Sequence, residues 1–272
     1  MIGGTEANFW RITVATGLLA IYGFGLGAGL TGAGLPFFLM SGILGIGLGD
    51  VAYFQSLPRL GPRLTLLLVQ CLTAPIGALI EWIWLGTTLT LAQLLCALTI
   101  LAGVGIALAP EEHVKITRRD LVIGSMAGLL AALGWATTTV LIRASRLATI
   151  SATKVLFYQL AASTALLLPL SPLLGESGVT ALNVPIVLAL AYQGVIVAFA
   201  SYLTWFWLLT RHLAGRLMVF SFLTPLFGVA FGVLFLGERL TPSFIVAAVC
   251  VTLGIVLVNL PASRQAAAES PE

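Results

Sequence analysis

The sequence predicts an all-α, polytopic transmembrane helical bundle of nine spans, arranged as an inverted repeat of a five-helix unit whose first helix is missing. Three observations lead to this fold class: long apolar runs, very few charged residues, and a segment that occurs twice. Of the 272 residues, 59% are hydrophobic and 8% are charged, against roughly 25% charged in ordinary soluble domains. A soluble domain could not cover so much apolar surface, so the composition indicates an integral membrane protein.

Nine apolar runs are long enough to cross a bilayer. A spanning helix needs about 20 mostly apolar residues, and it must be continuous because lipid offers backbone amides no hydrogen-bond partner. Gly61, Gly175 and Pro242 stand between such runs, where helices are expected to stop or start. The predicted spans are Asn8–Gly29, Leu35–Leu57, Pro62–Leu85, Thr90–Ala109, Leu121–Ile142, Lys154–Leu174, Val184–Thr210, Gly215–Leu236 and Pro242–Leu260.

The duplicated segment identifies the repeat. The run Leu72–Gly77 (LTAPIG) recurs as Leu223–Gly228 (LTPLFG), and Phe9-Trp10-Arg11 is matched by Phe157-Tyr158-Gln159. Further matches, such as Phe54 with Phe206, follow in the same order. Equivalent helices are five spans apart, which is an odd number, so the two copies are expected to have opposite orientations in the membrane. Inverted repeats of this kind are typical of secondary transporters.

The repeat divides the chain into four parts. Residues 1–110 are expected to form the first copy with four helices, 111–120 a charged loop, 121–260 the second copy with five helices, and 261–272 a disordered tail. The helix Leu121–Ile142 has no partner in the first copy, because its counterpart would lie before Met1. Either the sequence begins after that helix or the protein lacks it.

Several classes of protein are disfavoured by the sequence. The three cysteines lie singly inside apolar runs, without the spacing of a metal site or a disulfide, and neither a metal nor a cofactor is expected. The net charge of +3 comes from scattered loop residues, so nucleic acid is not an expected partner. There is no His/Asp/Glu cluster and no Ser–Lys pair, so an enzyme is not expected. Basic residues are divided almost evenly between the two sides, which leaves the orientation in the membrane open.

Short motifs add a family resemblance. Gly49–Phe54 (GDVAYF), Leu60–Leu64 (LGPRL), Leu236–Thr241 (LGERLT) and the pair Gly134-Trp135 occur in that setting of two copies. Together they resemble the EamA-type family of the drug/metabolite transporter superfamily, over nearly the whole chain. The resemblance implies ten helices in two inverted five-helix units, a central cavity, and export or exchange of small metabolites. This chain departs from that pattern in its missing first helix and in Thr87-Thr88, where a Gly-Glu-Arg type motif would stand.

Asp50 is the leading candidate for a functional residue. It lies well inside the second span, where a carboxylate is costly unless it faces water or a partner. It could bind a cationic group of a substrate or take up a coupling proton. Alternatively, it pairs with an arginine of a neighbouring helix for structural reasons.

Other polar residues of the spans are candidates for lining a cavity. Arg11 in the first copy is matched by Gln159 in the second, each preceded by an aromatic residue, and inverted copies would bring such pairs face to face. Helix packing is the alternative interpretation, because polar side chains often bond across spans. Pro75 and Pro225 interrupt equivalent helices and are candidate hinges or static kinks. The full set of cavity candidates is Asp50, Arg11, Tyr158, Gln159, Trp135, Tyr53, Tyr202 and Gln193.

These expectations combine into a functional hypothesis. The sequence predicts a secondary transporter that moves a small organic metabolite or drug-like solute across the cell membrane by alternating access, with a proton as a candidate coupling ion. The alternative is a non-transporting or degenerate membrane protein of the same fold, such as a scaffold or receptor. The substrate, the direction of transport and the oligomeric state are not predicted by the sequence.

Overall fold

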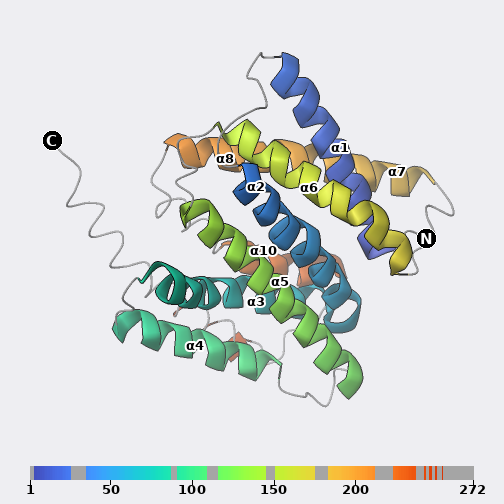
Figure 1. The fold of residues 1–272 in the computed structure, drawn as a ribbon. Coiled ribbons are helices and arrows are strands. Elements are labelled where there is room, and N and C mark those ends of the chain that lie inside the picture. Colours follow the sequence, from blue (N-terminus) through green and yellow to red (C-terminus); the bar gives the residue numbers. More distant parts are fainter. Residues whose placement is uncertain are drawn as a thin grey trace. The chain divides into compact units, whose positions relative to one another are not determined.

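The structure is a computed structural model that describes residues 3–25, 35–86, 91–108, 116–144, 151–174, 183–211 and 223–236, with the single residues 242, 245, 246, 249 and 253 (Figure 1). Within these ranges every regular element is a helix. In chain order they are α1 (Gly4–Gly25), α2 (Leu35–Ser41), η1 (Gly42–Gly49), α3 (Asp50–Leu85), α4 (Leu91–Ala107), α5 (Arg118–Ala144), α6 (Ala152–Leu173), α7 (Val184–Ala191), η3 (Tyr192–Ser201), α8 (Tyr202–Arg211) and α10 (Leu223–Leu236).

Several helices are long and apolar enough to cross a membrane. Within the described ranges there are four such stretches, and α1, which falls on the expected span Asn8–Gly29, is not among them. The expected span Pro242–Leu260 and the tail 261–272 lie outside the continuously described residues. The chain is therefore a helical membrane protein, while the number of nine spans stays a prediction. The four stretches are Leu35–Leu85, Arg118–Ile142, Thr153–Leu173 and Val184–Trp205.

Side-chain caps begin two of these helices. Before α5, Thr117 Oγ1 accepts a hydrogen bond from the backbone N–H of Asp120 and donates one to its carboxylate, which satisfies an N–H that has no partner within the helix. Before α7, the Asn183 side chain accepts from the backbone N–H of Ile186 at 3.0 Å. Polar residues at the ends of apolar runs thus fix where these helices begin.

The chain leaves helical geometry inside α3 at Gly61. This residue has φ 78° and ψ 162°, a conformation that a residue with a side chain rarely adopts. Pro62 follows and cannot donate a backbone hydrogen bond. The break therefore falls at the Leu60-Gly61-Pro62 sequence that predicts the boundary between two spans.

Two stretches of the chain wind as π-helices. The first is η1, between α2 and α3, and the second is η3, between α7 and α8. At the start of η1, the carbonyl of Ser41 accepts a hydrogen bond from Thr138 Oγ1, and the carbonyl of Gly42 accepts one from Ser163 Oγ. Side chains of α5 and α6 therefore bond the backbone where the winding changes. Short π-helical segments occur frequently at functional sites.

The chain separates into two compact units. Unit 1 contains Met1–Gln55 and Gly134–Arg211, and unit 2 contains Ser56–Leu133 and His212–Glu272. Each unit thus combines segments from both of the copies that the sequence predicts. Inside unit 2, Ser56 Oγ donates to the carbonyl of Gly124 and lies 3.2 Å from Thr65 Oγ1, which fixes α5 against α3.

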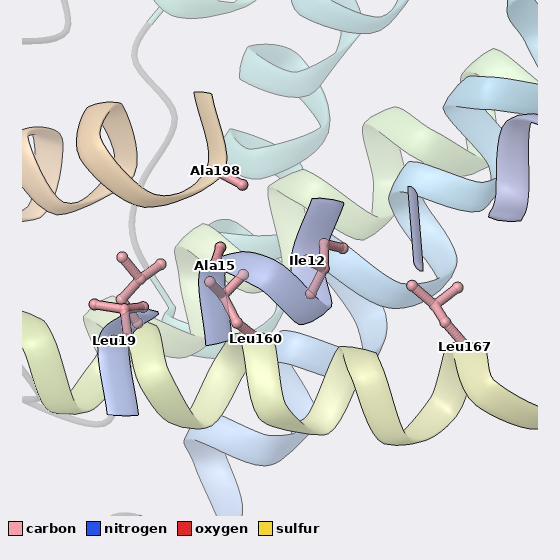
Figure 2. Packing of buried hydrophobic residues seen from close by; sticks show 7 residues of the cluster. Ile12, Ala15, Leu19, Leu160, Leu167 and Ala198 are labelled. Carbon is pink, nitrogen blue, oxygen red and sulfur yellow. The ribbon is translucent and has the colours of Figure 1, made fainter. Parts of the chain in front are cut away.

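The core of unit 1 lies between α1 and α6. Its fully buried members are Ile12, Ala15, Leu19, Leu156, Leu160, Leu167 and Ala198. From left to right in Figure 2, the residue numbers fall along α1, from Leu19 through Ala15 to Ile12. In the same direction they rise along α6, from Leu160 to Leu167. The two helices therefore run antiparallel along this contact.

Two neighbouring leucines of α6 provide a test of this core. Leu167 is fully buried, whereas Leu168 is 64% exposed. We expect Leu167→Ala to lower stability by on the order of 2 kcal/mol, because it leaves a cavity in the α1–α6 contact. Leu168→Ala is the matched control and should change stability little. Thermal unfolding of the purified protein in detergent measures the difference, and equal effects of the two substitutions would contradict this packing.

Candidate functional site

A buried ion pair joins α1 to the first residue of α3. The guanidinium of Arg11 donates from Nη2 to Oδ2 of Asp50, which lies 39 residues further along the chain. Only 7% of Arg11 and 4% of Asp50 is exposed. Charged groups inside membrane-spanning segments are costly and usually pair with one another. Arg11 and Asp50 satisfy that requirement within unit 1.

The second oxygen of Asp50 is held by a third helix. Trp135 Nε1, on α5, donates to Asp50 Oδ1 at 3.0 Å. The residue before Asp50 is Gly49, where an added Cβ would lie 3.0 Å from Cδ1 of the Trp135 ring. Glycine at this position therefore lets the indole approach closely enough to reach the carboxylate.

Aromatic rings surround the ion pair. The Tyr53 ring stacks on Trp135 with centroids 5.5 Å apart, and Cζ of Arg11 lies 5.3 Å from the centroid of Phe54. Tyr202, the first residue of α8, lies within interaction range of both Arg11 and Asp50. A cation over an aromatic face is attracted by the ring quadrupole. The charges are therefore enclosed by ring faces, tyrosine hydroxyls and an indole N–H.

Asn8 completes this group, and the sequence analysis missed it. Its Oδ1 accepts a hydrogen bond from Arg11 Nε at 2.8 Å, and its side chain is fully buried. The duplication contains a signal that could have found it. The alignment of Phe9-Trp10-Arg11 with Phe157-Tyr158-Gln159 places Asn8 opposite Leu156, so a polar residue stands where the other copy has an apolar one.

A second polar group lies where α2 meets η1. Gln159 Nε2 donates to Ser41 Oγ at 2.9 Å, and Ser163 Oγ donates to the carbonyls of both Gly42 and Gln159. Tyr158 stacks on Phe38 with ring centroids 6.1 Å apart. This group consists of neutral hydrogen bonds, in contrast to the charged group around Asp50.

The structure thus sorts the residues predicted to line a cavity into three sets. The charged group brings together Asp50, Arg11, Trp135, Tyr53 and Tyr202. The neutral group contains Tyr158 and Gln159. Gln193, in η3, is exposed and forms no hydrogen bond or ring contact with the ion pair in the described part of the chain.

The two candidate hinge prolines lie within helices. Pro75 is inside α3, where Gly61 is the residue with non-helical dihedral angles, so the helix continues through Pro75. Pro225 is in α10. Their role as hinges stays a prediction.

The described residues contain no cluster of three or more His, Cys, Asp or Glu side chains that could hold a metal ion. What the charged group offers instead is one cation and one anion in contact, with hydrogen-bonding groups and ring faces beside them. Groups of these kinds bind small molecules where a cavity brings a ligand to them.

Comparisons with known proteins agree with this description. The EamA-like transporter family matches residues 122–260. One solved structure, described only as a crystal structure of a protein, superposes with a TM-score of 0.70 over 96% of this chain and 90% of its own, at 21% sequence identity. At that identity the likeness shows a shared fold and nothing more. No curated protein matches the chain.

The fold and the buried charges together define a helical integral membrane protein with a polar site inside its spans. The chain belongs to the EamA-like transporter family. This family is part of the drug/metabolite transporter superfamily, so the resemblance stated from the sequence motifs is confirmed. In general terms the protein is a membrane transporter of that superfamily.

The ion pair makes a prediction about stability. Removing one partner leaves a buried charge without compensation, which typically costs about 3–5 kcal/mol. We therefore expect Arg11→Gln and Asp50→Asn each to lower the unfolding temperature in detergent. The double substitution should recover most of the loss, because it leaves no unpaired charge. Additive losses in a double-mutant cycle would contradict the pairing.

Proposed function

We propose that this protein is a secondary transporter that moves a small organic solute across the cell membrane by alternating access, with Asp50 as the group that responds to a coupling proton. The observation that carries the proposal is the Arg11–Asp50 pair, buried between α1 and α3 in a member of a transporter family. Ionisable residues inside membrane spans commonly mark the pathway of a substrate or a proton.

The contacts of Asp50 explain how a proton could change the structure. Its two oxygens accept from Arg11 on α1 and from Trp135 on α5. Protonation of the carboxylate would weaken the attraction to Arg11 and reduce the hydrogen bond from Trp135. A ligand or proton shifts a conformational equilibrium only through different affinities for the two states. The ion pair provides such a difference, because its strength depends on the charge of one group.

The proposal includes an inverted repeat, and contacts inside unit 1 support it. Thr16 and Thr164 are equivalent in the two copies, and their hydroxyl oxygens lie 3.3 Å apart. In a twofold arrangement only residues close to the axis can contact their own equivalents. The antiparallel course of α1 and α6 is also what inverted copies require (Figure 2).

A second set of contacts is exchanged between the copies. Gly42 and Gly194 are equivalent in the alignment that matches Phe54 with Phe206. A Cβ added to Gly42 would collide with the backbone of Gln159. One added to Gly194 would lie 2.9 Å from the side chain of Val14 and 3.4 Å from the carbonyl oxygen of Arg11. Arg11 and Gln159 are themselves equivalent, so each copy presents the same glycine to the same position of the other. The two π-helical segments also fall on matching residues.

Cysteine cross-linking tests the contact between the two copies. In a background without the three native cysteines, the pair Thr16→Cys and Thr164→Cys should form a disulfide when membranes are oxidised, because the two hydroxyls are in contact. The control pairs Thr164→Cys with Ile21→Cys, since Ile21 is 73% exposed and lies on another face of α1. Mass spectrometry of linked peptides measures the yield. A yield no higher than that of the control would contradict the proposed axis.

Substitution of Asp50 tests the transport mechanism. Purified protein in liposomes is supplied with a small-molecule extract of cells, and the solutes that enter are identified by mass spectrometry. We expect Asp50→Asn to reduce their uptake at least tenfold and to abolish its dependence on pH, because the proton-responsive group is gone. Asp120→Asn is the matched control, as Asp120 is a partly exposed carboxylate at the start of α5. Wild-type uptake and pH dependence in Asp50→Asn would reject the assignment.

A further inference from the structure

We infer that Asn8 is a hydrogen-bond donor for the transported solute and that this solute carries no net charge. The inference rests on the proposed transport function and deepens it by naming the chemical class of the substrate. Two observations carry it: a buried amide nitrogen that has no acceptor among the described residues, and a pair of charges that already neutralise each other.

The first observation concerns the orientation of the Asn8 amide. Its Oδ1 accepts from Arg11 Nε at 2.8 Å, and this bond fixes which end of the amide faces the guanidinium. Nδ2 therefore points away from Arg11. This nitrogen is buried and has no hydrogen-bond acceptor among the described residues. A buried donor left unsatisfied typically costs about 1–3 kcal/mol, so it indicates a position that an oxygen atom outside the chain is suited to fill.

The second copy has an apolar residue at the position equivalent to Asn8. Leu156 is the equivalent of Asn8 on α6 and is fully buried among apolar residues. A leucine at the matching place packs well, whereas Asn8 leaves a polar atom without a partner. The oxygen of Asn8 stabilises Arg11, whereas its nitrogen has no acceptor among the described residues and costs stability. Polar groups that cost stability without serving the fold are expected at functional sites.

The second observation concerns charge. Arg11 and Asp50 form a contact pair, so these two side chains together add no net formal charge beside Asn8. Both oxygens of Asp50 are engaged, one by Arg11 and one by Trp135. A solute with a net charge would add an uncompensated charge to a buried site, which is strongly unfavourable. A solute without net charge avoids this cost.

These two constraints define the class of solute. It presents a carbonyl, amide or carboxylate oxygen to Nδ2 of Asn8, and its charges sum to zero, as in neutral amides or in zwitterions. Organic cations and anions without an internal counter-charge do not fit. The stacked rings of Tyr53 and Trp135 lie beside Asp50 and offer apolar surface to the same molecule.

The charge rule is tested with the wild-type protein. Liposomes that contain the protein, and protein-free liposomes, are incubated at pH 7 with a small-molecule cell extract, and retained compounds are identified by mass spectrometry. We expect the compounds enriched by the protein to have no net charge. Enrichment of cations or anions would overturn the inference while leaving the transport function in place. If the protein enriches no compound, the transport function fails and the inference fails with it.

Two substitutions at Asn8 test the donor itself. Asn8→Leu installs the residue of the other copy, and we expect retained solutes to bind roughly 5- to 20-fold more weakly. It also removes the acceptor of Arg11 Nε, so the unfolding temperature should fall as well. Asn8→Asp keeps an acceptor for Arg11 but adds a negative charge, so it should shift the enriched compounds from neutral solutes towards cations.

Leu156→Asn is the matched control. It introduces the same chemical group at the equivalent position of α6, and it should lower stability without changing which solutes are enriched. Unchanged affinity in Asn8→Leu, or an unchanged set of solutes in Asn8→Asp, would overturn the role of Asn8.

Discussion

The interior of a membrane offers polar groups no water, and this constraint determines the structure around Asp50. Every charge and backbone carbonyl that lies inside the spans has to find its partner in the protein. Arg11 meets this demand for Asp50, and Thr138 and Ser163 meet it for the carbonyls at the start of η1. The helices of unit 1 are therefore positioned by a small number of polar bonds as well as by apolar packing.

Glycines make these polar bonds sterically attainable. Lipid and apolar side chains are similar solvents, so helices in a membrane associate through close packing more than through the hydrophobic effect. Gly49 admits the Trp135 ring next to Asp50, and Gly42 admits the backbone of Gln159. In both cases the small residue stands directly beside a hydrogen bond that joins two helices.

The sequence predicted where helices form better than it predicted which side chains contact one another. Apolar runs and Gly61 located helices and one break, because both depend on local chemistry. Asp50 was recognised as unusual within a span, and pairing with an arginine of a neighbouring helix was one interpretation of it. That Arg11 is the partner, 39 residues away, depends on the packing of three helices. Asn8 escaped notice because a polar residue near the start of a helix is ordinary. Its significance depends on tertiary contacts, because its nitrogen finds no acceptor in the described part of the chain, and on comparison with Leu156.

The position of Asp50 has a mechanical consequence. The carboxyl group of Asp50 connects three helices. Asp50 is the first residue of α3, and its two oxygens bond Arg11 on α1 and Trp135 on α5. Because both contacts use the same carboxylate, a change in its charge affects both of them. Addition of one proton to Asp50 would weaken its contacts with α1 and α5 at the same time. A chemical change at a single carboxyl group would thus allow whole helices to move.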